Sequence, residues 1–418
     1  MSPRSRRPPG RGFTLVELVV ALGIGAVVVM GAVALLIGQQ RAFQTGAADR
    51  ALQEAGRVAI ESLTSNLRMA GFGIDPALAF DFGAEEDVPM ARAPEGTAVS
   101  TPGFQCGTAV SCRDKVDGPD EIVFLQRNPY FAYPLAVGYS GGTTLTLTGP
   151  LRTPLRAGQI LQVICFTGNM YWAYVQVASD VDPSAAAQVP VTITGASGTD
   201  FPQQNALLAD ACFNSAAPQG STAATVADAA KVYKVDRYRY FVQSYDDQGN
   251  VQPWGTAGAR PYLMLDRGLG AVEVVAPDVE DLQLSYAFPA SAPALQAIGA
   301  TASTAIAAGP EGIDVAPEAG IPTYGDDANA PSRLTQHPAN IRAVRVGVVV
   351  RSAEFDPTLS NAGDRVIPAA GNRPDVTGPA GFRRLLIETT TAVRNLDARA
   401  PFFPVYSAGG DQFNVGGG

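Results

Sequence analysis

The chain has 418 residues, of which 46% are apolar and 17% are charged. It is therefore long enough to bury one large core or two modest ones, and too apolar for a solvated disordered polymer. The formal net charge is −9, and removal of the four arginines that precede Gly12 would take it to −13. Because a phosphate backbone binds clustered lysine and arginine, we expect no general nucleic-acid binding.

The chain begins with a short basic segment and a long apolar one. Residues 1–12 hold four arginines and no acid, and residues 13–37 are apolar with one charge, Glu17. The apolar segment is long enough to span a bilayer, and its basic flank favours the cytoplasmic side. We therefore predict a single-pass anchor with the rest of the chain outside the cytoplasm. An ordinary secretory signal is the alternative, with Ala32-Val33-Ala34 as its cleavage pattern, but further apolar residues follow at once.

The junction between the two segments resembles a known processing motif. Gly12-Phe13-Thr14-Leu15-Val16-Glu17-Leu18 is similar to the cleavage and methylation motif of type IV prepilins and type II secretion pseudopilins. The resemblance implies that a prepilin peptidase cuts after Gly12 and methylates the new amine of Phe13, which leaves residues 1–12 as a leader peptide. It also assigns the family's acidic residue at the fifth mature position to Glu17.

A carboxylate at this place needs a partner. An isolated charge in the hydrocarbon region costs several kcal/mol, roughly 2.5–3.5 on insertion scales. The nearest candidate cation is the freed amine of Phe13, in the same subunit or in a neighbour that enters the filament, and the resemblance implies this pairing for Glu17. The alternative is a charge tolerated at the membrane interface.

The helical pattern continues beyond the membrane segment. Apolar or small residues recur near a 3.6-residue period at Leu52, Gly56, Ile60, Leu63 and Leu67. We predict one helix over residues 13–70, of which 13–37 span the membrane, ended by a glycine-rich turn. Gly23, Gly25, Gly31 and Gly38 would allow local melting or close packing, or are ordinary membrane-helix glycines.

Short β-prone runs separated by turn residues follow the helix, and they predict an α+β fold with an antiparallel β-rich, pilin-like head over residues 71–418. The predicted strands are residues 121–126, 143–148, 160–166, 171–177, 232–244, 282–288 and 341–351. Residues 246–250 predict a hairpin whose acids serve the turn rather than a metal. Residues 178–230 and 289–340 are rich in Ala, Ser, Gly and Pro, so we expect loop insertions there.

Further motifs of this head resemble PilW-type minor pilins and fall in that family's order along the chain. They are the helix exit at residues 67–73, Gly118-Pro119-Asp120-Glu121-Ile122, the segment from Leu263 to Tyr286 with its Val-Glu-Asp-Leu-Gln-Leu-x-Tyr run, and the closing segment from Arg383 to Asn395.

Four cysteines offer three pairings, and the simplest joins Cys106 to Cys112 and Cys165 to Cys212. An extracytoplasmic setting favours bridges, with four reduced thiols as the alternative. Zinc is disfavoured because no CxxC motif occurs and the sole histidine, His337, lies far from the cysteines.

The sequence offers little for catalysis. His337 is the only histidine that could act as a general base, and it lies in a predicted loop. Residues 138–142 fit the letters GxSxG, but a β-prone run follows them where a nucleophile elbow needs a helix. We therefore expect no enzyme, no cofactor and no metal.

The resemblance implies a minor pilin of a type IV pilus, a subunit of a priming or tip complex. Its implied partners are the prepilin peptidase, other minor pilins, the major pilin, the inner-membrane assembly platform and membrane lipid. The implied location is the inner membrane and then the filament, with roles in adhesion, twitching motility or DNA uptake. A minor pseudopilin of a type II secretion system and a pilin-anchored adhesin are the alternatives.

Overall fold

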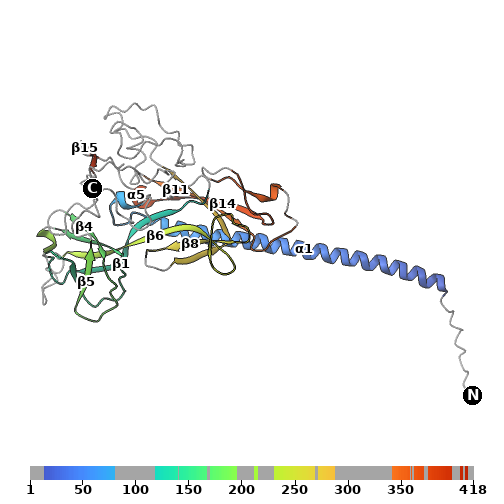
Figure 1. The fold of residues 1–418 in the computed structure, drawn as a ribbon, viewed down its shortest axis with the longest axis horizontal. Helices are drawn as coiled ribbons and strands as arrows, with labels where there is room; N and C mark the ends of the chain where they lie inside the picture. The colour runs from blue at the N-terminus through green and yellow to red at the C-terminus, as the bar shows by residue number, and fades with distance from the viewer. Residues whose placement is uncertain are drawn as a thin grey trace, which may run out of the picture. The chain divides into compact units, whose positions relative to one another are not determined.

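The computed structural model describes residues 14–80, 118–139, 141–166, 170–194, 211–214, 230–268, 272–287, 341–357, 359, 362–370, 375–397, 405–407 and 410–412. The chain divides between Ala51 and Leu52 into two units, which are described separately. Helix α1, Leu15–Leu67, contributes to both (Figure 1). The predicted helix of residues 13–70 is therefore observed nearly in full, with residues 68–70 in the turn that ends it and Phe13 outside the described residues.

The second unit holds a sheet of nine antiparallel strands. Its order is β2-β5-β4-β3-β6-β8-β9, with β1 and β7 also paired to β6. The strands are β1 Ile122–Pro134, β2 Thr144–Thr148, β3 Ile160–Phe166, β4 Met170–Val177, β5 Gln188–Thr194, β6 Lys231–Tyr245, β7 Val251–Gln252, β8 Arg260–Asp266 and β9 Val272–Pro277. The long strand β6 is central because its first half pairs with β3 and its second half pairs with β8.

A second sheet has three antiparallel strands in the order β10-β11-β14, which are Val279–Ala287, Ala343–Arg351 and Arg384–Ala392. Asp278 alone separates β9 of the first sheet from β10 of the second, at a φ of 60°. The remaining elements are short: η1 Pro76–Leu78, η2 Ala211–Asn214, η5 Ala362–Arg365, β12 Val366–Ile367, β13 Val376–Thr377, α5 Arg394–Asp397, β15 Val405–Ser407 and β16 Gly410–Gln412.

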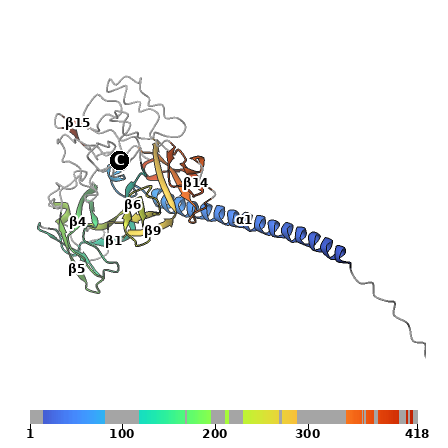
Figure 2. The ribbon, with the colours of Figure 1, turned by 45° about the vertical axis from the view of Figure 1, so that its right-hand side comes forward.

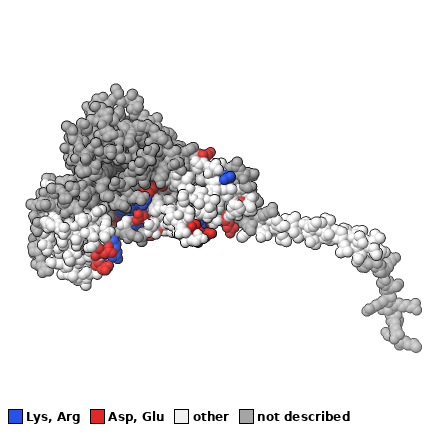
Figure 3. Space-filling model, viewed as in Figure 1, with Lys and Arg blue, Asp and Glu red and all other residues white. Residues whose placement is uncertain are grey.

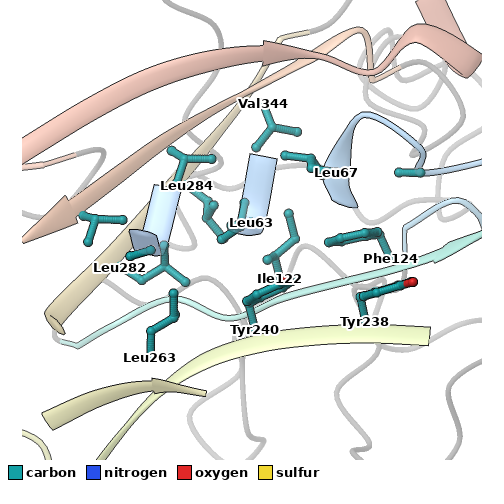
Figure 4. Close-up of a cluster of buried hydrophobic side chains, with 14 of the residues drawn as sticks. Leu63, Leu67, Ile122, Phe124, Tyr238, Tyr240, Leu263, Leu282, Leu284 and Val344 are labelled. Carbon is teal, nitrogen blue, oxygen red and sulfur yellow. The ribbon is translucent and has the colours of Figure 1, made fainter. Parts of the chain in front are cut away.

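The main core lies between the two sheets, and the second half of α1 fills it. Figure 4 shows Leu63 and Leu67 between Val344 of β11 and Tyr240 of β6. All four side chains are fully or almost fully buried. Each buried Leu stabilises the fold by roughly 1.5–3 kcal/mol relative to an exposed one. The predicted apolar face of residues 52–67 is thus the face that packs.

A separate core lies under the first half of β6. It collects apolar residues of β1 to β5, among them Leu147, Val163, Val175 and Val191. The views in Figures 1 and 2 agree in placing β4 and β5 at the end of the head away from β14. The head therefore has two main cores joined by β1 and β6, and a smaller buried cluster that includes Leu125 of β1 and Val235 of β6.

All seven predicted strands are observed, and β14 lies within the closing segment from Arg383 to Asn395. The stretch 178–230 departs from the prediction of a loop insertion, because it contains β5. Its Val189, Val191 and Ile193 alternate with exposed residues and face the second core. The insertion predicted at residues 289–340 lies outside the described residues.

Candidate assembly interface and the anchor of its helix

The first half of α1 is apolar, and no other described part of the chain covers it. Large apolar side chains from Leu15 to Ile37 are exposed by about half or more, for example Leu15 at 79% and Val33 at 47%. In the described residues α1 is the one helix whose length and composition suffice to cross a membrane. The face of this rod seen in Figure 3 shows no charged side chain. Such a surface requires cover from lipid or from other helices.

Glu17 takes part in a capping box at the start of α1. Its Oε2 accepts the Thr14 backbone N–H at 2.9 Å and the Thr14 hydroxyl at 3.0 Å, and its own N–H donates to Thr14 Oγ1 at 3.2 Å. This reciprocal pattern satisfies donors that an α-helix leaves open at its N-terminus. Thr14 was not among the predicted site residues, although Thr-x-x-Glu before an apolar run is the sequence signal of a capping box. Gly12 and Phe13 lie outside the described residues.

The exit of α1 is fastened to the head by backbone and side-chain bonds. Gly71 N–H donates to Leu125 O at 2.9 Å, and Arg127 N–H donates to Phe72 O at 2.8 Å. Asn395 Nδ2 donates to Ala70 O at 3.2 Å and lies 3.4 Å from Arg68 O. These carbonyls follow the last helical turn, where no intrahelical donor remains. Asn395 of the closing Arg-Asn motif therefore caps the C-terminal end of α1.

The motifs quoted for the PilW resemblance meet around β10. Asp120 N–H donates to Leu282 O at 2.7 Å, and Leu284 N–H donates to Asp120 Oδ2 at 2.8 Å. Gln283 Nε2 donates to Gly118 O at 2.9 Å. The Gly-Pro-Asp segment is thus held against β10 by one backbone bond and two bonds that involve side chains. The two segments are more than 160 positions apart in the sequence, so no local pattern predicted this contact.

A cluster of charged side chains, of which Glu280, Arg351 and Arg384 are buried, lies where the chain passes from one sheet to the other. Asp278 accepts two bonds of 2.8 Å from Arg260. Glu280 accepts bonds of 2.5 and 2.9 Å from Arg384, and these two side chains are only 3% and 4% exposed. Arg351 lies 3.9 Å from Glu280. The Glu280–Arg384 pair is bidentate, the geometry in which an ion pair best offsets the loss of water.

The same cluster shifts the pKa of two arginines in opposite directions. The hydrogen bonds that Arg260 donates to Asp278 raise the pKa of Arg260. Burial lowers the pKa of Arg351, and the negative charge of Glu280 opposes that effect. Both remain cations at neutral pH, since a guanidinium keeps its proton in proteins. The cluster therefore acts as a structural brace of opposite charges.

The disulfide between Cys165 and Cys212 is present, with a Cα–Cα distance of 6.0 Å. This confirms one predicted pair. It ties η2 to β3, and Phe213 beside it is fully buried in the second core. Cys106 and Cys112 lie outside the described residues, so their pairing stays a prediction.

The remaining sequence candidates carry no catalytic arrangement in the described part of the chain. Asp246 accepts bonds from Asn250, Gln248 and Gln252, which confirms the turn between β6 and β7. Gly141 and Gly142 have positive φ and precede β2, as expected for a turn rather than a nucleophile elbow. Ser140 and His337 lie outside the described residues. No metal-ligand group of three His, Cys, Asp or Glu occurs among the residues described.

Two family models match the chain. The model of the prokaryotic N-terminal methylation motif matches residues 9–33, and the model of type IV pilus-assembly protein W matches residues 239–395. No curated protein and no solved structure matches it.

The methylation motif, the apolar first half of α1 and the antiparallel head define a pilin-type protein. The match over residues 239–395 covers β8 to β14 and the charge cluster, and over this part the chain is similar to the PilW family of type IV pilus-assembly proteins. That family has a structural rather than a catalytic role.

Proposed function

We propose that this chain is a minor pilin of a type IV pilus that primes assembly or sits in the tip complex. The observation that carries the proposal is the exposed apolar half of α1, which begins at the Thr14–Glu17 cap and follows a prepilin motif. A helix of this kind is stored in a bilayer and then packed among other helices in a filament.

Processing supplies the missing partner of Glu17. The prepilin peptidase cuts after Gly12 and methylates the amine of Phe13. The capping box involves Thr14 and not Phe13, so it survives the cut. The new amine then offers a positive charge to the Glu17 carboxylate, from the same subunit or from the neighbour below. This pairing offsets the unfavourable burial of a carboxylate among apolar helices.

The proposed topology follows from the charges that flank the helix. The arginine-rich leader stays in the cytoplasm, residues 13–37 cross the inner membrane once, and the head folds outside, where the Cys165–Cys212 bridge persists. We propose a second bridge between Cys106 and Cys112. The proposed partners are other minor pilins, the major pilin and the inner-membrane assembly platform, and the proposed role involves no catalysis on a substrate.

Mass spectrometry of the protein from its host tests the processing step. We expect a chain that starts at methylated Phe13. A chain that retains Met1 would contradict the proposal, because the leader blocks the amine that Glu17 needs.

Piliation tests the assembly step. Deletion of the gene is expected to abolish surface pili, and Glu17→Ala is expected to reproduce this loss with normal amounts of folded protein in the membrane. Glu61→Ala, an exposed acid of the same helix, is the matched control and should leave pili intact. Normal pili with lost attachment would favour the adhesin, and intact pili with failed protein export would favour the pseudopilin.

A further inference from the structure

Three polar side chains of β1 and β6 form a connected group between the two cores of the head. Asp236 Oδ1 lies 3.1 Å from Lys234 Nζ, and Asp236 Oδ2 accepts a 2.7 Å bond from Asn128 Nδ2. One carboxylate thus contacts an amine and an amide at the same time. Asn128 lies where the pairing of β1 with β6 is interrupted, between Arg127 and Ala132.

The group is largely withdrawn from water. The side chains of Lys234 and Asp236 are 17% and 15% exposed. They point to the same side of β6 as Val232 in one core and Tyr238 in the other, because side chains alternate along a strand. The chain has only three lysines, Lys115, Lys231 and Lys234. A lysine in such a place is available as a nucleophile once it loses its proton.

The orientation of the Asn128 amide is set by its neighbours. A carboxylate only accepts hydrogen bonds here, so Nδ2 faces Asp236. The Tyr130 backbone N–H only donates, and it reaches Asn128 Oδ1 at 2.9 Å. A donor on this oxygen stabilises the negative charge that develops when a nucleophile attacks Cγ.

We propose that Lys234 and Asn128 form an intramolecular isopeptide bond, with Asp236 as the catalytic acid and base. The bond would join β1 to β6 at the interruption of their pairing and so lock the two cores of the head together. The inference does not depend on the proposed role in a pilus.

The reaction needs no oxidant and no co-reactant. Asp236 takes a proton from the Lys234 ammonium, and the neutral Nζ attacks Asn128 Cγ. The Tyr130 N–H holds the oxygen of the tetrahedral intermediate. Asp236 returns the proton to Nδ2, the Cγ–Nδ2 bond breaks and ammonia leaves. Nζ then loses its extra proton, so that one amide replaces an amine and a primary amide.

Intact-mass measurement of the purified full chain tests the bond directly. After reduction and alkylation, we expect a mass lower by one ammonia than that calculated from the observed N-terminus and its modification. Trypsin gives a second readout, because it does not cleave after an acylated lysine. The expected branched product joins residues 128–152 to residues 232–237, and an unmodified chain yields residues 232–234 and 235–237 instead.

Matched variants separate the reaction from the fold. Lys234→Arg keeps the charge beside Asp236 but forms no such amide, and Asp236→Ala removes the proton carrier. Both variants are expected to show the full calculated mass, without the loss of one ammonia, and to yield no branched peptide. Lys231→Arg, three residues earlier on the same strand, is expected to behave as the wild type.

Two outcomes would overturn the proposal. One is a folded wild-type chain with its full calculated mass and free residues 232–234, in which case the three side chains are only a hydrogen-bonded brace. The other is an unchanged branched product in Asp236→Ala, which would remove the role assigned to that carboxylate.

Discussion

The two halves of α1 differ in what covers them. The large apolar side chains from Leu15 to Phe43 are exposed, and a Cβ added at Gly23, Gly31 or Gly46 meets nothing within 4 Å. From Leu52 the helix is packed in the head, and a Cβ added at Gly56 would collide with Ile387 of β14. One helix therefore serves two purposes. Its second half completes the core of the head, and its first half is free to make the contacts with lipid and other subunits that we propose.

This difference predicts that substitutions in the second half of α1, or in the residues that hold it to the head, change the stability of the head. Matched substitutions in the first half of α1, or in more exposed ion pairs, should leave that stability nearly unchanged. Function should respond in the opposite way, as expected for Glu17.

The largest effect is expected at the buried charge cluster. Arg384→Ala removes the bidentate partner of Glu280 and leaves a buried carboxylate, which should lower the free energy of unfolding by about 3–5 kcal/mol. Urea denaturation of the full chain in detergent measures this loss. Arg345→Ala on the neighbouring strand breaks the more exposed pair with Glu388 and should change it by less than about 1 kcal/mol. An equal loss of unfolding free energy in the two variants would show that the buried Glu280–Arg384 pair stabilises the head no more than the exposed pair does.

The next effect tests the helix itself. Gly56→Leu overfills the contact with Ile387 and Val350, and should destabilise the head by about 1–3 kcal/mol. Gly46→Leu gains the same helix propensity in an open position, so the difference between the two variants isolates packing. Thermal unfolding of both proteins provides the measurement. A Gly56→Leu protein as stable as Gly46→Leu would contradict the observed contact.

A smaller effect is expected at the helix exit. Asn395→Ala removes the donor to the carbonyls of Ala70 and Arg68 and should cost about 0.5–1.5 kcal/mol. Arg394→Ala changes an exposed neighbour and serves as the control. Hydrogen exchange should show faster opening of residues 60–67 in the Asn395 variant alone. Unchanged exchange there would mean that the backbone bonds of Gly71 and Arg127 suffice.

The smallest effect concerns the hairpin between β6 and β7. Bonds from the side chain and backbone of Asn250 hold the pKa of Asp246 below its ordinary value. The stabilisation that Asp246 provides is present above the ordinary aspartate pKa of 3.8, and it is lost as the pH falls through the lowered pKa of the folded state. The amide signals of Gln248 and Asn250 should therefore shift only in acid below that value. Asp246→Asn should abolish the shift, and a midpoint above 3.8 would contradict the expected direction.

The sequence alone was sufficient for features that depend on neighbours along the chain. The 3.6-residue period of Leu52 to Leu67 predicted the buried face of α1, and β-prone runs between turn residues predicted seven strands of the head. The Cys165–Cys212 pair followed from simple order. Strand β5 was missed because the Ala- and Ser-rich composition around it obscured the alternation of Val189, Val191 and Ile193.

Only the tertiary structure showed which distant residues meet. Arg384 and Glu280 are 104 positions apart, Asn395 reaches Ala70 across 325, and Asn128 reaches Asp236 across 108. Local periodicity states which face of an element is buried, but not against which partner. Partners depend on the register of β6 between its neighbours and on the turn at Asp278, where the chain passes from one sheet to the other. These are set by the packing of the whole head, and no short window of sequence contains them.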